Sequence, residues 1–202
     1  MSIVINGTGS ITGISVGGLP DSIVDAGTLA TDSVVAAKLG TDAVTADALK
    51  SDAIAALDLP AGSVLQVVNV FTTTETTSSS TTYADIGLGA TITPSSTSSK
   101  ILVITSIPIR KRIQTSGSSN DGGAHLKLVR GSTDLKVIGQ YIAWDNQNNW
   151  GQETPSMTWL DSPSTTSATV YKIQMHSSVA SNYAYTCHDT SVATLLLMEI
   201  AG

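Results

Sequence analysis

The chain has few of the residues that carry chemistry or cross-link a fold. Its 202 residues include one cysteine, one phenylalanine and three histidines, and only 13% of them are charged. A single thiol, Cys187, excludes a disulfide within the chain, so stability must come from packing or from assembly. No apolar run approaches the length of a transmembrane span, and residues 1–5 lack the basic region of a signal peptide. We therefore expect no membrane insertion.

Positive charge is also scarce, and the acidic residues are unevenly distributed. Of the net charge of -6, residues 1–60 carry -5, from seven Asp against Lys38 and Lys50. Binding to nucleic acid needs a basic face, which this chain lacks, so we expect no nucleic-acid partner. Sparse charge with abundant Gly, Ser and Thr favours rigid extracellular β-structure over a cytosolic enzyme.

Catalytic and metal-binding signatures are missing as well. The sequence holds no phosphate-binding loop, no Gly-x-Ser-x-Gly and no dinucleotide fingerprint. Cys187 and His188 are adjacent, and in an extended strand they would point to opposite faces. The histidines, at 125, 176 and 188, share no metal-ligand spacing, although one residue per chain could still build an ion site on a symmetry axis. Asp145, Glu153 and Asp161 could act as glycosidase carboxylates, but loops of this length contain two acids by chance. We expect no enzyme, no cofactor and no metal.

A ten-residue repeat fills residues 19–60. Leu recurs at 19, 29, 39, 49 and 59, with Val or Ile halfway between, and Thr-Asp or Ser-Asp precedes three of the copies. Residues five apart turn by about 140° on a helix and about 180° on a strand, so neither element alone keeps them on one face. The repeat indicates a small module, such as a capped helical turn joined to an extended piece.

These repeats contain too few apolar residues to enclose a core within one chain, so they predict partner chains. We expect residues 19–61 to form a trimeric shaft that stacks apolar layers along its axis. The alternative is a disordered, Ala-rich linker. The predicted axial residues are Leu29, Val34, Leu39, Val44, Leu49, Ile54 and Leu59.

Residues 1–18 combine five Gly with alternating Ile and Val around an Asn6-Gly7 turn signal. This pattern indicates an extended arm or short hairpin that orders on a larger assembly. A frayed terminus is the alternative.

From residue 62 the pattern becomes that of strands. Residues 64–71, 89–93, 101–104, 124–130, 170–176 and 195–200 read as strands, with a polar interruption at 72–82. Tyr171, Ile173 and Met175 should face inward, and the last strand is apolar on both faces and needs cover on both. About ten short strands without a helical period predict an antiparallel β-sandwich or jelly roll over residues 62–202. The chain is thus expected to be mainly β.

Particular sequences carry a resemblance to a known family. The repeat Thr-Asp-Ala-Val-Thr-Ala-Asp-Ala-Leu (41–49) and the start Asn-Gly-Thr-Gly-Ser-Ile-Thr-Gly (6–13) resemble the stalks of tailed-bacteriophage fibres, especially of marine and cyanobacterial phages. The head resembles the receptor-binding tips of these fibres, through residues 82–88, 92–103, 159–163 and 197–200. The resemblance implies trimeric jelly-roll heads like those of the tumour-necrosis-factor and complement superfamilies. It also implies an extracellular virion protein in the tail fibre.

We expect residues 1–18 to bind the baseplate, the tail or another virion protein, and the head to bind host-surface carbohydrate or protein. Two alternatives are a capsid or neck fibre without a receptor role and a polysaccharide-degrading tip. The receptor candidates lie in an aromatic and amide-rich segment and in the one basic cluster. They are Tyr141, Trp144, Asn146, Asn148 and Trp150, with Arg110 and Arg112 as a second group.

Both groups have a simpler interpretation. Trp144 and Trp159 could be core residues, which would leave only Trp150 exposed. The basic cluster at 110–112 could meet an anionic polymer, or it could be a solvated strand edge that deters strand addition.

Overall fold

Twelve strands and one 3-10 turn account for the regular structure in the part of the chain described. The computed structural model describes residues 59–112, 122–145, 150–180 and 182–202, together with 34 and 39. The elements are β1 (Val64–Thr72), β2 (Thr76–Ser78), β3 (Ala84–Ile92), β4 (Lys100–Ser106), β5 (Ile109–Arg112), β6 (Gly122–Arg130), β7 (Thr133–Asp145), β8 (Trp150–Glu153), β9 (Ser156–Asp161), β10 (Thr169–Ser177), β11 (Tyr183–Thr186), η4 (His188–Thr190) and β12 (Ala193–Ile200). The predicted arm and nearly all of the predicted shaft lie outside these residues.

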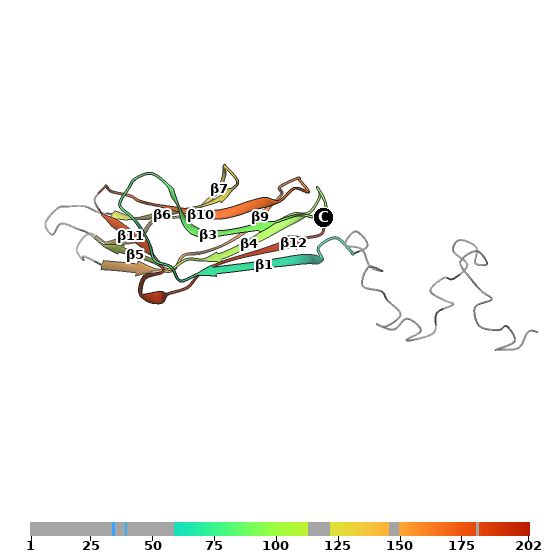
Figure 1. Cartoon of the computed structure of the whole chain (residues 1–202), viewed down its shortest axis with the longest axis horizontal. Coiled ribbons are helices and arrows are strands. Elements are labelled where there is room, and N and C mark those ends of the chain that lie inside the picture. Colours follow the sequence, from blue (N-terminus) through green and yellow to red (C-terminus); the bar gives the residue numbers. More distant parts are fainter. Residues whose placement is uncertain (1–33, 35–38, 40–58, 113–121, 146–149, 181) are drawn as a thin grey trace, which may run out of the picture. The chain divides into compact units, whose positions relative to one another are not determined.

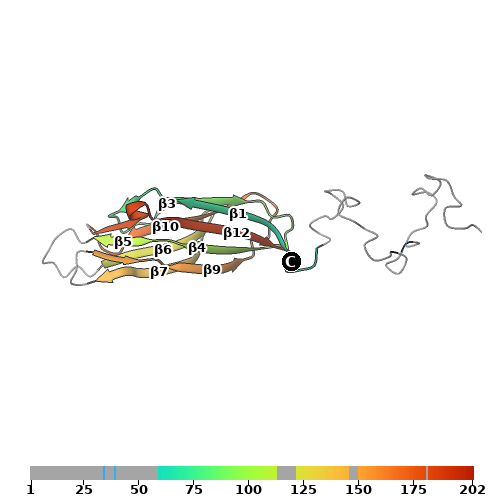
Figure 2. The ribbon, with the colours of Figure 1, turned by 90° about the horizontal axis from the view of Figure 1, so that it is seen from below.

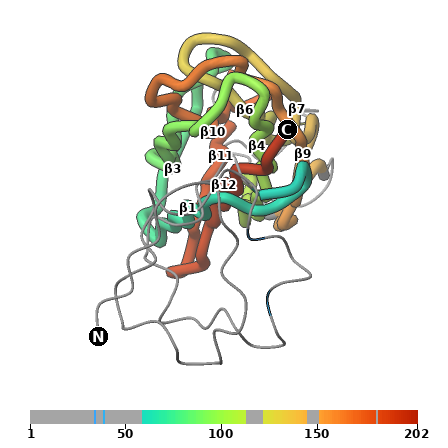
Figure 3. The backbone as a smooth tube through the Cα atoms, turned by 90° about the vertical axis from the view of Figure 1, so that its right-hand side faces the viewer, coloured from blue at the N-terminus to red at the C-terminus, as the bar shows by residue number. Residues whose placement is uncertain are grey.

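Eight of the strands form an antiparallel jelly roll. The proximal sheet has the order β1-β12-β4-β9, and the covering sheet opposite it has the order β3-β10-β6-β7 (Figures 1 and 3). The chain alternates between these two layers, as two Greek keys require. This arrangement confirms the predicted antiparallel sandwich, with twelve strands where about ten were expected.

Alternation of side chains along each strand places the core between the layers. Tyr171, Ile173 and Met175 of β10 are buried, as predicted, and they face Leu195 and Leu197 of β12 in one hydrophobic cluster. The strand β4 is apolar on both faces and lies between β12 and β9.

The remaining four strands form a distal sheet with the order β2-β11-β5-β8. Each continues a strand of the proximal sheet, because β2 follows β1, β5 follows β4, β8 precedes β9 and β11 precedes β12. The polar run 72–82, predicted as an interruption, therefore contains the strand β2. The four links between the two sheets, residues 73–75, 107–108, 154–155 and 187–192, are called the waist below.

Two of the four waist links contain proline, which cannot donate to a sheet ladder. Pro108 and Pro155 still accept backbone hydrogen bonds there, from the Cys187 N–H at 3.4 Å and the Ile107 N–H at 3.0 Å. The waist thus interrupts the proximal and distal sheets across all four strands, and backbone hydrogen bonds join the links that form it. Beyond it, β5 lies at the end of the sandwich opposite the C-terminus (Figures 1 and 2), and β11 lies beside it (Figure 1).

Buried carboxylates fix the sandwich at the C-terminal end. Glu199 is fully buried and accepts hydrogen bonds from Gln66 Nε2 at 2.5 Å and from the Ser95 N–H at 2.7 Å. Asp161 accepts from Arg130 and from the Tyr171 hydroxyl, both at 2.6 Å. The same end is closed by backbone bonds between residues 62–63 and 201.

Candidate functional site

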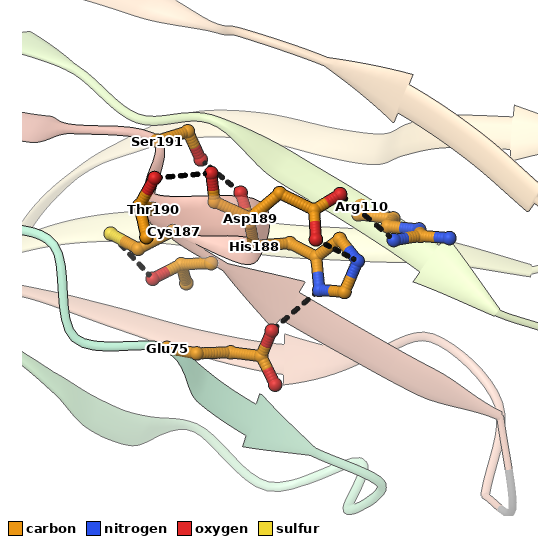
Figure 4. Close-up of polar contacts among 8 residues, drawn as sticks. Glu75, Arg110, Cys187, His188, Asp189, Thr190 and Ser191 are labelled. Carbon is orange, nitrogen blue, oxygen red and sulfur yellow. Dashed lines mark hydrogen bonds and ion pairs between the residues drawn. The ribbon is translucent and has the colours of Figure 1, made fainter.

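Polar side chains from three separate segments meet at the waist. Glu75 comes from the link between β1 and β2, Arg110 from β5, and His188 and Asp189 from η4 (Figure 4). His188 Nδ1 lies 2.5 Å from a Glu75 oxygen, and its Nε2 lies 3.3 Å from an Asp189 oxygen. The other Asp189 oxygen is 3.7 Å from the Arg110 guanidinium. The four side chains form one continuous series of polar contacts across the break.

The backbone of η4 is held in an unusual conformation. Cys187, Asp189 and Thr190 have φ of 55°, 53° and 62°, in the left-handed region that costs side-chain-bearing residues about 1–2 kcal/mol each. Ser191 Oγ donates to the His188 carbonyl at 2.8 Å, and the buried Cys187 thiol donates to the Thr72 carbonyl at 3.4 Å. Such strain persists only where the surroundings fix it, and it is concentrated at functional sites.

A pocket of about 290 Å³ opens beside this network. Its lining is polar for the most part, with two carboxylates, one guanidinium, one imidazole and one amide. Pro108 and Ile109 are the apolar lining residues. The lining residues are Pro108, Ile109, Arg110, Gln152, Glu153, Thr154, His188, Asp189 and Ser191. The pocket can therefore offer several hydrogen-bond donors and acceptors to a small polar ligand.

The structure divides the predicted basic cluster. Arg110 lines the pocket and Arg112 is exposed, but Lys111 between them is only 1% exposed and faces the covering sheet. The three side chains therefore form no continuous basic patch. The alternative of a solvated strand edge is wrong, because β5 is paired on one side with β11 and on the other with β8.

Two of the receptor candidates, Tyr141 and Arg110, lie on different surfaces. Tyr141 is exposed, and its ring packs at 4.8 Å on His125, which points outward from the covering sheet. Arg110 points outward from the distal sheet, on the other side of the sandwich. Trp144 is exposed and Trp159 packs against the core, so the core interpretation holds for Trp159 alone.

Other predicted residues are placed only in part. Asn146 and Asn148 lie outside the described residues, and of Trp150 only the backbone is described, paired with Arg112. Of the predicted axial residues, Val34, Leu39 and Leu59 are exposed, whereas Leu29, Val44, Leu49 and Ile54 lie outside the described part. Their axial role stays a prediction.

Those residues considered for catalysis whose side chains are described do not come together. Cys187 and His188 lie in a turn rather than the expected strand, with the thiol directed to Thr72 and the imidazole to Glu75. Glu153 ends β8 and Asp161 ends β9, so at about 3.3 Å per residue they stand some 20 Å or more apart. Among the residues with described side chains, no group of three or more His, Cys, Asp or Glu is arranged to hold a metal ion.

No helix in the described part has the length and hydropathy to cross a membrane.

Sequence reasoning missed Glu75, Asp189 and two tyrosines of β11, Tyr183 and Tyr185. Glu75 and Asp189 are far apart in sequence and meet only through the fold. For β11, a usable signal was present: Tyr-Ala-Tyr-Thr alternates large and small residues, and the structure buries Ala184 and Thr186 while both tyrosines stay partly exposed.

Comparison with known proteins gives little similarity. No protein-family model matches the chain, and no curated protein matches it. Among solved structures, the infectious bursal disease virus VP2 subviral particle matches 68% of this chain and 33% of its own, at 12% identity and a TM-score of 0.37. A structure of the Gx strain of that virus matches 68% of this chain and 37% of its own, at 12% identity and a TM-score of 0.32. The chain thus spans about a third of the length of either neighbour, and neither match indicates a function.

Proposed function

We propose that this chain is a virion fibre protein of a tailed bacteriophage, which assembles as a homotrimer and attaches the particle to the host cell surface. The observation that carries the proposal is an apolar surface that one chain leaves uncovered. This surface is the outer face of the proximal sheet.

Four apolar side chains form a row across that face. In the strand register, Val67 of β1 lies opposite Met198, Met198 opposite Leu102, and Leu102 opposite Leu160. Val67 is 54% exposed and Leu160 48%, and nearby Phe71 is 68% exposed. Leaving such a continuous apolar patch in water is unfavourable, at roughly 25 cal/mol per Å².

The covering sheet provides the contrast, because charged and amide side chains lie on its outer face. Asp85 accepts hydrogen bonds from Lys172 at 2.9 Å and from Gln174 at 2.7 Å. Lys127 pairs with Asp134 at 2.7 Å. Val137 and Val170 are exposed there among charged groups, whereas the apolar side chains of the proximal face form a row, so we place the partner on the proximal side.

Identical copies of the chain are the partner that fits best. The Leu and Val repeat of residues 19–59 also lacks a partner within one chain, and copies in parallel would cover the repeat and the head face together. The polar pocket and the strained turn lie at the waist, which the length of β1 separates from residues 59–63. A fibre with its shaft at one end would present this pocket to the host.

Assembly is tested by light scattering on the full chain. The wild type should have three times the mass of the 20.8 kDa chain, and Val67→Glu should dissociate it, because a buried charge in the interface costs several kcal/mol. Val170→Glu is the matched control, since Val170 is 42% exposed on the outer face of the covering sheet. A monomeric wild type, or a trimeric Val67→Glu, would contradict the proposed interface.

Attachment is tested on particles. Gold-labelled antibody against the head should mark the tail fibres in electron micrographs, and purified protein should compete with phage adsorption. Label on the capsid or neck, without competition, would instead favour a structural fibre. Deletion of residues 1–18 should leave a soluble trimer that is not incorporated into virions.

A further inference from the structure

The outer face of the distal sheet carries two tyrosines on β11 beside two arginines on β5. Tyr185 lies opposite Arg110 in the register and Tyr183 lies opposite Arg112. The intervening residues of both strands, Lys111 and Ala184, are buried, so all four side chains point away from the core. The two tyrosine rings are 6.0 Å apart between centroids and inclined by 36°.

This aromatic pair leads into the waist pocket. The Tyr185 ring centroid is 5.8 Å from that of His188, which lines the pocket and is held by Glu75. On the other side of Arg110, Gln152 lies directly opposite in β8 and also lines the pocket. The row of aromatic rings therefore ends at the pocket, whose lining residues carry hydrogen-bonding groups.

We propose that this surface, Tyr183 and Tyr185 with the waist pocket, binds an uncharged saccharide; the proposal rests on the attachment function above. Sugar rings present C–H groups that pack on aromatic rings and hydroxyls that need several donors and acceptors close together. Arg110, Gln152 and Glu153 supply these groups at the pocket. Its volume of about 290 Å³ lies at the small end of ligand sites and fits a terminal sugar, with the next unit over Tyr185.

The charge of the pocket selects against acidic glycans. Glu153 and Asp189 line it and Glu75 contacts His188, so three carboxylates stand against Arg110 in the pocket and Arg112 beside Tyr183. Asp189 already lies within ion-pair distance of the Arg110 guanidinium. A phosphorylated or uronic-acid polymer would meet a surplus of carboxylates, whereas a neutral sugar would not.

The site is tested with the full-length protein on an array of neutral and acidic bacterial glycans. Wild type should bind at least one neutral glycan, and Tyr185→Ala should weaken that binding about fivefold or more, because ring stacking is lost. Tyr185→Phe should bind as wild type. Tyr141→Ala is the matched control, because Tyr141 is an exposed tyrosine on the other side of the sandwich. Light scattering should give every variant the wild-type mass.

Binding to only acidic glycans, to none, or with equal affinity in Tyr185→Ala would overturn the proposal. Treated host cells separate this failure from a failure of the attachment function. Periodate, which cleaves sugar diols, should abolish binding of the protein to cells, whereas protease should not. Cells that lose binding after protease alone would identify a protein receptor: attachment would stand and the saccharide site would fall. No binding to untreated cells would refute attachment itself.

Discussion

Replacing Glu199 with Gln tests whether a buried charge holds the last strand to the sandwich. Glu199 Oε1 accepts from the Ser95 N–H at 2.7 Å and from Ser95 Oγ at 2.6 Å, while Oε2 accepts from Gln66 Nε2 at 2.5 Å. A carboxylate can satisfy both sides at once. A glutamine amide has one accepting oxygen, so in either orientation its NH₂ group faces a donor.

The expected cost is that of one set of charge-assisted hydrogen bonds. Such bonds contribute about 1.5–3 kcal/mol each, so Glu199→Gln should lower the free energy of unfolding by about 2–3 kcal/mol at pH 7. The side-chain volume is nearly unchanged, so no cavity term is added. Glu153→Gln, at an exposed position, should change it by no more than about 0.5 kcal/mol.

The pH dependence of the stability distinguishes the contribution of the Glu199 charge from that of the side-chain shape. Burial alone would raise the Glu199 pKa, but the hydrogen bonds from Gln66 and Ser95 outweigh it and hold the pKa below its usual 4.5. A carboxyl group with a lowered folded pKa stabilises the fold above its unfolded pKa, and this contribution is lost as the pH falls through the folded pKa. The difference between wild type and Glu199→Gln should therefore shrink below about pH 4.5.

Urea unfolding at fixed protein concentration, at pH 7 and pH 3.5, measures both quantities. A deficit of Glu199→Gln that is equal at the two pH values would refute the electrostatic explanation. A deficit below about 0.5 kcal/mol at pH 7 would show that the hydrogen bonds contribute no net stability.

Three further substitutions test other parts of the head. Burial and a neighbouring imidazole lower the pKa of His125 below 6.5, so the unfolded chain binds protons more readily and stability should fall as the pH drops below 6.5. His125→Phe should flatten this dependence in thermal melts between pH 7 and 5. Tyr171→Phe removes a 2.6 Å hydrogen bond to Asp161 and should cost about 1–2 kcal/mol in urea unfolding. Gly123→Ala would place Cβ 2.5 Å from the Tyr141 carbonyl carbon, so it should cost about 1–3 kcal/mol or more, with a matching fall in melting temperature.

The strands that sequence predicted well are those whose pattern depends on local alternation. In β6, Leu126 and Leu128 are buried while His125 and Lys127 point outward, as their spacing indicated. Side chains two apart share a face whatever the rest of the chain does. The core of the jelly roll could therefore be identified before its strand order was known.

The distal sheet could not be predicted in the same way. Its strands have only three or four residues, so even the alternation in β11 is too short to identify a strand by itself. They exist because each extends a longer strand beyond the waist. The site depends on still longer separations: Glu75 and His188 are 113 residues apart in sequence. Only the folded register brings the link after β1 beside the turn before β12.

The motifs that carried the family resemblance have a structural explanation. Ser95 and Glu199 belong to two different motifs, and they hydrogen-bond to each other. Asp161, from a third motif, accepts from Arg130 and Tyr171 beneath the covering sheet. Buried polar groups need partners at fixed positions, so such residues change less freely than apolar ones of similar size. These motifs therefore indicate how the head folds and carry no information about its ligand.

The two outer faces proposed for assembly and for binding lie on the same side of the sandwich. Residues of the proximal and distal sheets that face inward, such as Val103 and Ile109, are buried in one core against the covering sheet. Their outward residues must therefore point the same way. The outward side chains change in character at the waist. They form the apolar row at Val67 on the proximal sheet and include Arg110 and Tyr185 on the distal sheet. In a trimer that buries the proximal face, the three distal faces would stand next to the axis at the tip. Sites grouped in this way can engage neighbouring sugars of one surface polymer together, so contacts that are weak singly would give firm attachment.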